Sequence, residues 1–399
     1  MPRGKDQPRT ALVLPGGGAR GAFQVGVLKA IAEILPRDSS NPFQIISGTS
    51  AGAVNSVVLA SRAHSFRTAV AELERVWGHF RCNHVYRTDH LTMLKSSLHW
   101  MIALAFGGWL VGMPKSLLDN SPLRDLLGRN VHFPRIRDAI EDGHLAAAAV
   151  TAAGYASARS TTFFEAAPQQ TGWKRTRRVG KNTELNLDHL MASIAVPMVF
   201  PPVRIGNEYF GDGAMRQATP LSPVVRLGAD RILVIGMRDE TGGVEPKTAG
   251  DPPSFGQIAG YMLDTLFMDG LYSDLERVTR VNDLLDSMPD AKPVAESRRY
   301  RSIDTMLIVP SEDLQSIADK HRAELPFAIR ALLRGVGGEN KLLSFLMFER
   351  AYTRELMKLG YRDAIKVRDQ LHAFVTGGDV PRLFAPNWIK RDLSGFGSP

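Results

Sequence analysis

The order of apolar and polar positions along the chain predicts an alternation of strands and helices. The apolar run at 10–14 predicts a short buried strand, and a glycine-rich loop over 15–21 follows it. Residues 22–35 are apolar on nearly every side, as in a buried helix. A second apolar run, 43–46, predicts the next strand, and the small residues of 53–60 predict another helix. This order is typical of a parallel sheet with right-handed crossovers.

The pattern continues as far as residue 238. Further strands are predicted at 145–155, 161–164 and 231–236, and helices at 69–80, 121–127, 189–195 and 222–227. Two short apolar segments flank Gly206-Asn207, a pair typical of two-residue turns, so 203–210 is predicted to be a β-hairpin. The expected fold class is α/β, with a mainly parallel central sheet between two layers of helices.

Composition divides the chain into four parts. Residues 239–255 are rich in glycine, proline and charge, which predicts a linker. The other parts are a mobile N-terminal arm at 1–9, an α/β domain at 10–238 that carries the catalytic candidates, and a mainly helical C-terminal extension at 256–399. Within the extension, helices are predicted at 256–286, 311–334 and 339–376, and a strand at 305–309 that could add to the sheet edge.

The composition is that of a globular protein with a large core. The 399 residues are 44% hydrophobic and 23% charged. The single cysteine, Cys82, excludes an internal disulfide and suits a reducing compartment. Its neighbours form no catalytic signature, so an inert, half-buried thiol is favoured over a nucleophile. The polar first nine residues lack the apolar core of a signal peptide, and we expect a cytoplasmic location.

The chain is basic, with a formal net charge of +8. Such a charge favours anionic partners. Because no zinc-finger spacing, RNA-binding motif or basic heptad occurs, a transiently contacted membrane surface is favoured over nucleic acid. Residues 174–181 hold five cations, which make either a solvated loop or a patch facing lipid headgroups. Residues 100–113 hold two tryptophans and no charge, which suits either a buried helix or a flap peripheral at the membrane.

The pentapeptide Gly48-Thr49-Ser50-Ala51-Gly52 stands between a predicted strand and a predicted helix. A sharp strand-to-helix turn forces its apex residue into a strained backbone conformation, and flanking glycines remove the Cβ atoms that would clash there. The apex hydroxyl is then exposed at a helix N-terminus, where negative charge is favoured. Ser50 is therefore the candidate nucleophile.

The glycine-rich loop supplies candidate oxyanion donors. Consecutive glycines leave backbone N–H groups uncovered at the start of the 22–35 helix. The loop also spells Gly16-x-Gly18-x-x-Gly21, a dinucleotide fingerprint, but that fingerprint expects a carboxylate after the second strand, where Ser50 stands instead. Arg20 has three interpretations: it holds the loop, meets an anionic headgroup, or is an ordinary surface arginine.

The general base is less clearly marked. Asp212 directly follows an apolar strand and lies between two glycines, so its carboxylate can approach another loop closely. An ordinary α/β-hydrolase would instead use a histidine late in the chain. The candidates His321 and His372 fall in helical patterns, where a surface or half-buried structural role is favoured for each.

Three motifs, taken in order, resemble the patatin-like phospholipase family. They are Gly16-Gly17-Gly18-Ala19-Arg20-Gly21, Gly48-Thr49-Ser50-Ala51-Gly52 and Asp212-Gly213-Ala214. Residues 192–202 also resemble the segment before that family's aspartate, and the likeness covers roughly residues 10–238. Pro15 departs from the pattern, since many members carry an acidic residue there, and it is expected to change loop geometry rather than activity.

The resemblance implies a three-layer α/β/α fold and a Ser–Asp dyad without histidine. Ser50 is then the nucleophile and Asp212 the base. The implied oxyanion donors are Gly17 and Gly18, with Gly16 and Ala51 beside them, and the supporting motif residues are Arg20, Gly21, Gly48, Gly52, Gly213 and Ala214. Because an ordinary carboxylate is a weak base, this mechanism requires desolvation to raise the pKa of Asp212.

The implied activity is hydrolysis of lipid acyl esters, above all of phospholipids, through an acyl-Ser50 intermediate. The substrate is then a lipid at a membrane surface, and no cofactor is implied. No metal is implied either, because no His-Glu-x-x-His or clustered ligand spacing occurs. Three alternatives stay open: a histidine-assisted esterase of the ordinary α/β-hydrolase type, a nucleotide-binding oxidoreductase, and a lipid-binding module without catalysis.

Overall fold

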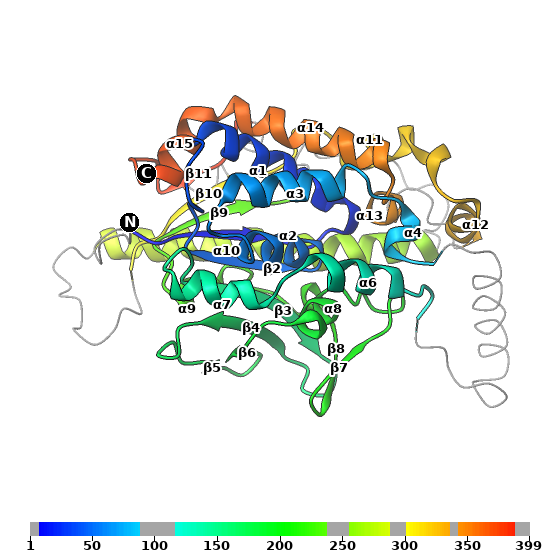
Figure 1. Cartoon of the computed structure of the whole chain (residues 1–399), viewed down its shortest axis with the longest axis horizontal. Coiled ribbons are helices and arrows are strands. Elements are labelled where there is room, and N and C mark those ends of the chain that lie inside the picture. Colours follow the sequence, from blue (N-terminus) through cyan, green and yellow to red (C-terminus); the bar gives the residue numbers. More distant parts are fainter. Residues whose placement is uncertain (1–7, 88–115, 238–254, 288–300, 336–341, 388–399) are drawn as a thin grey trace.

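One sheet with helices on both faces organises the molecule (Figure 1). The computed structural model describes residues 8–87, 116–237, 255–287, 301–335 and 342–387. Within these residues the strand order is β11-β10-β9-β1-β2-β3-β4-β6-β5, and the β7–β8 hairpin joins the sheet through β3. The strands from β11 to β3 are parallel, whereas β4 and β8 run antiparallel to β3.

Most of the central strands are buried along their whole length, as expected for a parallel sheet covered on both faces. The strands are β1 Thr10–Leu14, β2 Ile45–Thr49, β3 Ala147–Gly154, β4 Ser160–Ala166, β5 Trp173–Lys174, β6 Arg178–Asn182, β7 Val203–Ile205, β8 Glu208–Asp212, β9 Arg231–Ile235, β10 Asp304–Ile308 and β11 Leu383–Phe384. The helices are α1 Ala22–Ile34, α2 Ala51–Ala60, α3 Phe66–Trp77, α4 Cys82–Val85, α6 Ser121–Asn130, α7 Pro134–Glu141, α8 Leu187–Ser193, α9 Ser222–Leu227, α10 Phe255–Asp286, α11 Leu314–Lys320, α12 Phe327–Gly335, α13 Leu343–Leu346, α14 Arg350–Lys366 and α15 Arg368–Thr376. Short 3-10 turns are η1 Gly18–Gly21, η2 Gly213–Arg216 and η3 Arg322–Glu324.

Successive residues of β1 enter two different cores. Leu12 and Leu14 pack with apolar residues of α1, α3 and α14, which lie together on one side of the strands in Figure 1. Ala11 and Val13 pack with residues of α9 and α10 on the other side. This alternation follows from the period-two geometry of a strand. The predicted three-layer α/β/α fold with a mainly parallel sheet is therefore confirmed.

Several predicted element ends shift in the structure. The second strand was expected at 43–46 and the helix after it at 53–60, but β2 continues to Thr49 and α2 begins at Ala51. The turn between them is thus a single residue, Ser50. The basic run at 174–181, expected as a loop or patch, forms the β5–β6 hairpin.

The C-terminal part supplies strands as well as helices. The strand expected at the sheet edge, β10, instead lies between β9 and β11, which corrects that prediction. The helix expected over 311–334 is interrupted before α12, where Pro326 cannot donate a backbone hydrogen bond. The expected 339–376 helix is divided into α13, α14 and α15, and α14 packs along α1.

Three of the expected features lie wholly or mostly outside the described residues. They are the 100–113 segment, most of the 239–255 linker, and most of the 1–9 arm. The division of the chain into an α/β domain and an extension therefore stays a prediction.

The register of the sheet brings three loops to one edge. β1 and β2 are parallel neighbours, so the glycine loop after Leu14 and the turn after Thr49 leave the same edge of the sheet. Thr49 pairs with Thr151 of β3, and the next β3 residue, Ala152, pairs with Asp212 at the end of β8. Ligands of open α/β sheets bind at this edge, outside the carboxyl ends of the strands.

Candidate active site

Ser50 forms a strained turn between β2 and α2. Its φ is 55°, which is rare for a residue other than glycine. The turn is closed too tightly for side chains beside it: a Cβ on Gly48 would lie 2.3 Å from the Gly52 carbonyl oxygen, and one on Gly52 would lie 1.9 Å from that of Leu14. The two glycines of the motif are thus required by close backbone approaches.

Ser193 holds this turn in place. The Ser50 N–H donates to Ser193 Oγ at 3.0 Å, and the Ser193 hydroxyl donates to the Thr151 carbonyl at 2.7 Å. All three residues are buried. This chain of hydrogen bonds ties the turn to α8 and β3 through the Ser50 backbone, and it does not use the Ser50 hydroxyl. Sequence reasoning missed Ser193, although it lies in the 192–202 segment that carried part of the family resemblance.

Asp212 reaches the same place from the opposite direction. As the last residue of β8 it is 1% exposed, and its backbone N–H donates to the Ala195 carbonyl at 2.8 Å. Its Oδ1 accepts a hydrogen bond from the Ala214 N–H at 2.9 Å. Its Oδ2 is buried without a hydrogen-bond partner among the described residues. One oxygen of the carboxylate is therefore fixed, and the other is available.

The buried position changes the acidity of Asp212. Desolvation raises the pKa of Asp212 to about 7, and interactions with the Ser50 hydroxyl and the Ala214 N–H offset part of this rise. The Ser50 hydroxyl therefore lies close to the carboxylate, although no hydrogen bond of regular geometry joins them. A carboxylate with this pKa is a far better base than an ordinary aspartate.

The glycine loop places backbone donors beside Ser50. Gly18 has a φ of 58°, and a Cβ there would lie 2.3 Å from the Phe345 carbonyl oxygen. No hydrogen bond to another described residue occupies the N–H groups of Gly17, Gly18 or Ala51. These N–H groups are therefore available for the role of oxyanion donor that is expected from the sequence.

A buried polar network anchors this loop. Gln24 donates to the carbonyls of Pro15 and Ile235, at 3.1 and 3.2 Å. Asn55 donates to Gln24 at 2.9 Å and accepts from the Trp77 indole N–H at 2.8 Å. The loop is therefore fixed by side chains from α1, α2 and α3, which the sequence motif did not indicate. Fixed donors need little reorganisation when charge develops during a reaction.

Arg20 holds the loop to the C-terminal part of the chain. It is 5% exposed, donates twice to Ser344 Oγ at 3.0 and 2.8 Å, and lies 4.0 Å above the Phe345 ring. Of the three interpretations from the sequence, the structure selects the first. The surface and headgroup-binding interpretations of Arg20 are wrong because its guanidinium is buried against α13.

Phe345 of α13 also packs at the edge of the candidate site. Phe345 packs against Val196 and Ala214, and it also touches the glycine loop at Gly18. Ser50 is accordingly only 3% exposed. A small cavity lined by Gly16, Thr49 and Ala214, among others, lies next to these buried residues.

The other candidates from the sequence lie elsewhere. Cys82 is fully buried, and burial raises the pKa of its thiol, so it stays protonated. Burial alone would lower the pKa of His321, but hydrogen bonds to Glu355 and Glu324 outweigh this and raise it. His372 is exposed on α15. Neither histidine has a recorded contact with Ser50 or Asp212.

A nucleotide or metal site has little support in the described residues. A dinucleotide fingerprint requires a carboxylate at the end of the second strand, but β2 ends in Thr49. The nearby carboxylate, Asp38, precedes the strand. Within the described ranges, no three His, Cys, Asp or Glu side chains come together as metal ligands would.

A model of the patatin-like phospholipase family matches residues 12–225, from β1 into α9. The chain belongs to this family. The match includes the glycine loop, Ser50 and Asp212. Members of the family are lipid acyl hydrolases, which supports an esterase activity on lipids. None of the helices in the described part of the chain has the length and apolar character needed to cross a membrane.

Solved structures resemble this family member only distantly. VipD from Legionella pneumophila is 14% identical with a TM-score of 0.37, over 91% of this chain and 67% of that one. The type III effector protein ExoU is 13% identical with a TM-score of 0.33, over 92% of this chain and 53% of that one. The structure of the ExoU–SpcU complex of Pseudomonas aeruginosa is 16% identical with a TM-score of 0.30, over 94% of this chain and 73% of that one. Comparison with curated protein sequences gives no match.

Proposed function

We propose that the protein is a phospholipase A-type serine esterase that uses Ser50 as nucleophile and Asp212 as general base. The observation that carries the proposal is the register of the sheet. Thr49 pairs with Thr151, and the adjacent Ala152 pairs with Asp212, which supports a Ser50–Asp212 pair at this edge of the sheet. The effect of the Ser50 hydroxyl on the pKa of Asp212 supports the same pairing.

Acylation of the enzyme is the first half of the proposed reaction. Oδ2 of Asp212 takes the hydroxyl proton as Ser50 Oγ attacks the ester carbonyl carbon, and the carbonyl oxygen becomes an oxyanion. The N–H groups of Gly17, Gly18 and Ala51 stabilise that charge. The tetrahedral intermediate collapses, the bond to the alcohol oxygen breaks, and Asp212 donates its proton to that oxygen. The products are a free alcohol and an acyl-Ser50 ester.

Deacylation repeats these steps with water. Asp212 takes a proton from water as the water oxygen attacks the acyl carbon. Collapse releases the fatty acid, and Asp212 returns the proton to Ser50 Oγ. A carboxylate with a pKa near 7 suits both halves, because it accepts and returns a proton at neutral pH.

The deciding experiment is labelling with a lipid-like fluorophosphonate in the presence of phospholipid vesicles. We expect stoichiometric labelling of the wild type at Ser50 and none of Ser50→Ala, with an exposed serine, Ser287→Ala, as the matched control. His321→Ala and His372→Ala should both keep labelling and hydrolysis. A protein that binds vesicles but resists the probe would be a lipid-binding module, and loss of hydrolysis in either histidine variant would restore the histidine-assisted alternative.

A further inference from the structure

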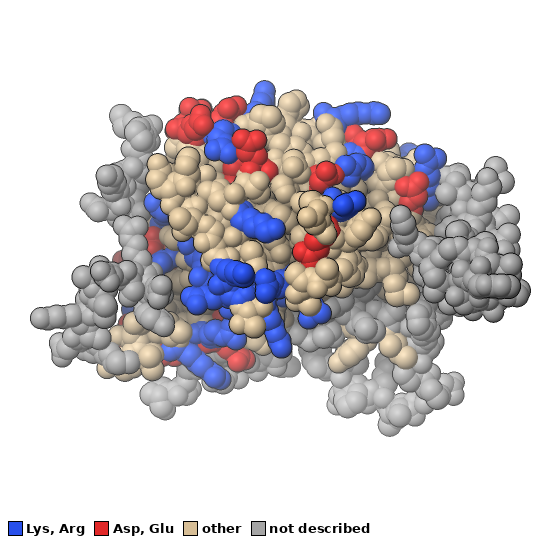
Figure 2. All heavy atoms as spheres, turned by 90° about the horizontal axis from the view of Figure 1, so that it is seen from below, with Lys and Arg blue, Asp and Glu red and all other residues tan. Residues whose placement is uncertain are grey.

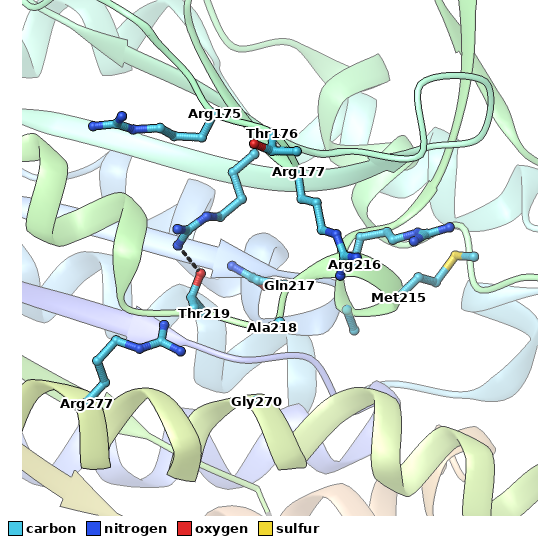
Figure 3. A pocket seen from close by; sticks show the side chains of 12 residues that line it. Arg175, Thr176, Arg177, Met215, Arg216, Gln217, Ala218, Thr219, Gly270 and Arg277 are labelled. Atoms are coloured by element: carbon cyan, nitrogen blue, oxygen red, sulfur yellow. Dashed lines mark hydrogen bonds between the residues drawn. The ribbon is translucent and has the colours of Figure 1, made fainter.

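A pocket of about 720 Å³ is lined in part by the η2 turn, which follows Asp212, and arginines dominate its wall. We call it the arginine pocket, defined by Arg175, Arg177, Arg178, Arg216 and Arg277. Figure 3 shows Arg175 and Arg177 on the β5–β6 hairpin, Arg216 on the η2 turn and Arg277 on α10. Figure 2 shows Lys and Arg side chains gathered on the face seen from below, with few acidic ones among them.

The arginine pocket holds more positive charge than the described residues neutralise. Arg178 donates to Thr219 Oγ1 at 2.5 Å, and Arg277 lies 3.5 Å from the carboxylate of Asp274. No carboxylate lies within ion-pair distance of Arg175, Arg177 or Arg216 among the described residues. Cations that line one pocket without enough counter-charge repel one another, so a bound anion would stabilise the arrangement.

The arginine pocket adjoins the candidate active site. Ala214, Gln217 and Gly270 line both the arginine pocket and the small cavity beside Gly16 and Thr49. Two of these residues also touch the dyad region directly. The Ala214 N–H donates to Asp212, and Gln217 Oε1 accepts from the Thr49 hydroxyl at 2.5 Å. A ligand held by the arginines would therefore extend past Gln217 towards Ser50.

We propose that the arginine pocket binds the phosphate-bearing headgroup of an anionic phospholipid substrate while its acyl ester lies at Ser50. This inference rests on the proposed function and adds the substrate class. Guanidinium groups bind phosphate oxygens in pairs, and several together match a phosphomonoester, which carries more than one negative charge. A zwitterionic headgroup such as choline would bring its own cation to the same pocket and be disfavoured.

The lining favours a lipid headgroup over a nucleic acid. Single-stranded nucleic acids are bound by basic grooves with aromatic side chains on which bases stack. The lining residues here are Arg, Thr, Met, Gln, Ala and Gly, with no aromatic side chain among them. The lining therefore offers donors for phosphate oxygens but no aromatic surface on which nucleic-acid bases could stack.

The test compares hydrolysis of three lipids with the same acyl chains in neutral micelles. They are a phosphatidic acid, a phosphatidylcholine and a diacylglycerol without phosphate. The test variant is Arg175→Gln/Arg177→Gln/Arg216→Gln, and the control is Arg129→Gln/Arg135→Gln/Arg280→Gln, which removes the same charge outside the pocket. In the test variant we expect KM for phosphatidic acid to rise roughly tenfold or more with little change in kcat. Diacylglycerol hydrolysis should change in neither variant.

A binding experiment separates this inference from the proposed chemistry. The Ser50→Ala protein should sediment with phosphatidylcholine vesicles that contain phosphatidic acid, but not with pure phosphatidylcholine vesicles, and should lose that binding when the three pocket arginines are replaced. Soluble glycerol 3-phosphate should compete only weakly. If the wild type hydrolyses no lipid but this binding holds, the chemistry fails and the headgroup site stands.

Three results would overturn the headgroup site. The first is hydrolysis that occurs without preference for phosphatidic acid. The second is a test variant that behaves like its control. The third is arginine-dependent binding of glycerol 3-phosphate or a single-stranded oligonucleotide in place of phosphatidic acid vesicles.

Discussion

Asp212 and Arg216 are four residues apart, yet they belong to regions built in opposite ways. Asp212 is 1% exposed, in a region where Ser50, the glycine loop and Arg20 are all buried and held by the backbone or by partners. Arg216 is exposed at the rim of the arginine pocket with no carboxylate beside it in the described structure. The η2 turn separates the two regions.

The two regions use the same residue type for different purposes. Arg20 is tied to Ser344 and stacked on Phe345, so its charge serves to join the glycine loop to α13. Arg175, Arg177 and Arg216 of the pocket are exposed and have no carboxylate partner among the described residues, so their donors are available for a ligand. Burial, rather than residue type, decides whether an arginine is structural. Changes in the buried region should therefore affect chemistry or stability, and changes in the pocket should affect binding alone.

The largest effect should come from Asp212→Asn. The amide keeps the shape of the side chain but removes the base, so kcat/KM for a lipid ester should fall by roughly a thousandfold or more. The melting temperature should not fall, because the amide relieves a desolvated carboxylate. Retention of near wild-type turnover would remove Asp212 from the mechanism and break the assignment of chemistry to the buried region.

Gly18→Ala should have the next largest effect. A Cβ there meets the Phe345 carbonyl oxygen at 2.3 Å, so the loop or α13 must move, and we expect a loss of at least about 2 kcal/mol in stability and of most activity. The matched control is Gly206→Ala in the hairpin turn. Its φ is 61°, close to the 58° of Gly18, but no atom lies within 4 Å of its Cβ position.

The Gly206→Ala variant isolates the cost of backbone strain, which is about 1 kcal/mol. Only the excess in Gly18→Ala reports the contact with α13. Denaturant unfolding and ester hydrolysis of both variants measure it. Equal losses in the two variants would show that the close packing of α13 on the loop contributes nothing.

The pH dependence should follow the raised pKa of Asp212. Because the base must be ionised, kcat/KM should rise tenfold per pH unit below about 7 and level off above it. Stability should run the other way. The folded protein keeps the Asp212 proton up to about pH 7, whereas an unfolded aspartate releases it near pH 3.8. The free energy of unfolding should therefore decrease as the pH rises from about 3.8 to about 7.

The control for this pH dependence is Asp212→Asn. Titration of residue 212 disappears in that variant, so its unfolding free energy should vary less with pH across the same window. A rate profile whose rising limb lies near pH 3.8 would show that burial does not tune this carboxylate.

Much of the buried region could be predicted from the sequence, and the reason is local. The strand, glycine loop and helix around Gly18, and the strand-to-helix turn at Ser50, are set by contacts between residues close in the chain. The glycines also mark backbone approaches that permit no other residue. Asp212 needed the family resemblance, because its place beside Ser50 depends on a pairing with β3 across some sixty residues.

What the sequence did not indicate depends on distant partners. Arg20 meets Ser344 more than three hundred residues away, so its burial left no local pattern. The arginine pocket combines the β5–β6 hairpin, η2 and α10, and only the hairpin stood out as a basic run. The strand predicted at the sheet edge became an inner one for the same reason, since β11 joins it from the far end of the chain.

Arg20→Met tests the buried side of the comparison by stability. The change removes two hydrogen bonds to Ser344 and the contact over Phe345, and it should lower the free energy of unfolding by about 2–3 kcal/mol. Arg20→Lys should recover only part of this loss, because an ammonium group does not reproduce the planar guanidinium geometry. An Arg20→Met variant as stable as the wild type would mean that the loop is held by Gln24 and Asn55 alone.

The smallest effect should come from Arg216→Met, the matched change on the exposed side. Its guanidinium has no hydrogen-bond or ion-pair partner among the described residues, so the free energy of unfolding should change by less than about 0.5 kcal/mol, and removing one of several like charges should make that change a gain rather than a loss. Added phosphate should raise the free energy of unfolding of the wild type more than that of this variant. An anion that binds only the folded pocket stabilises the folded state, and the variant has one arginine fewer to bind it. If Arg216→Met destabilises the protein as much as Arg20→Met, the pocket arginines are structural, and the division between the two regions does not hold.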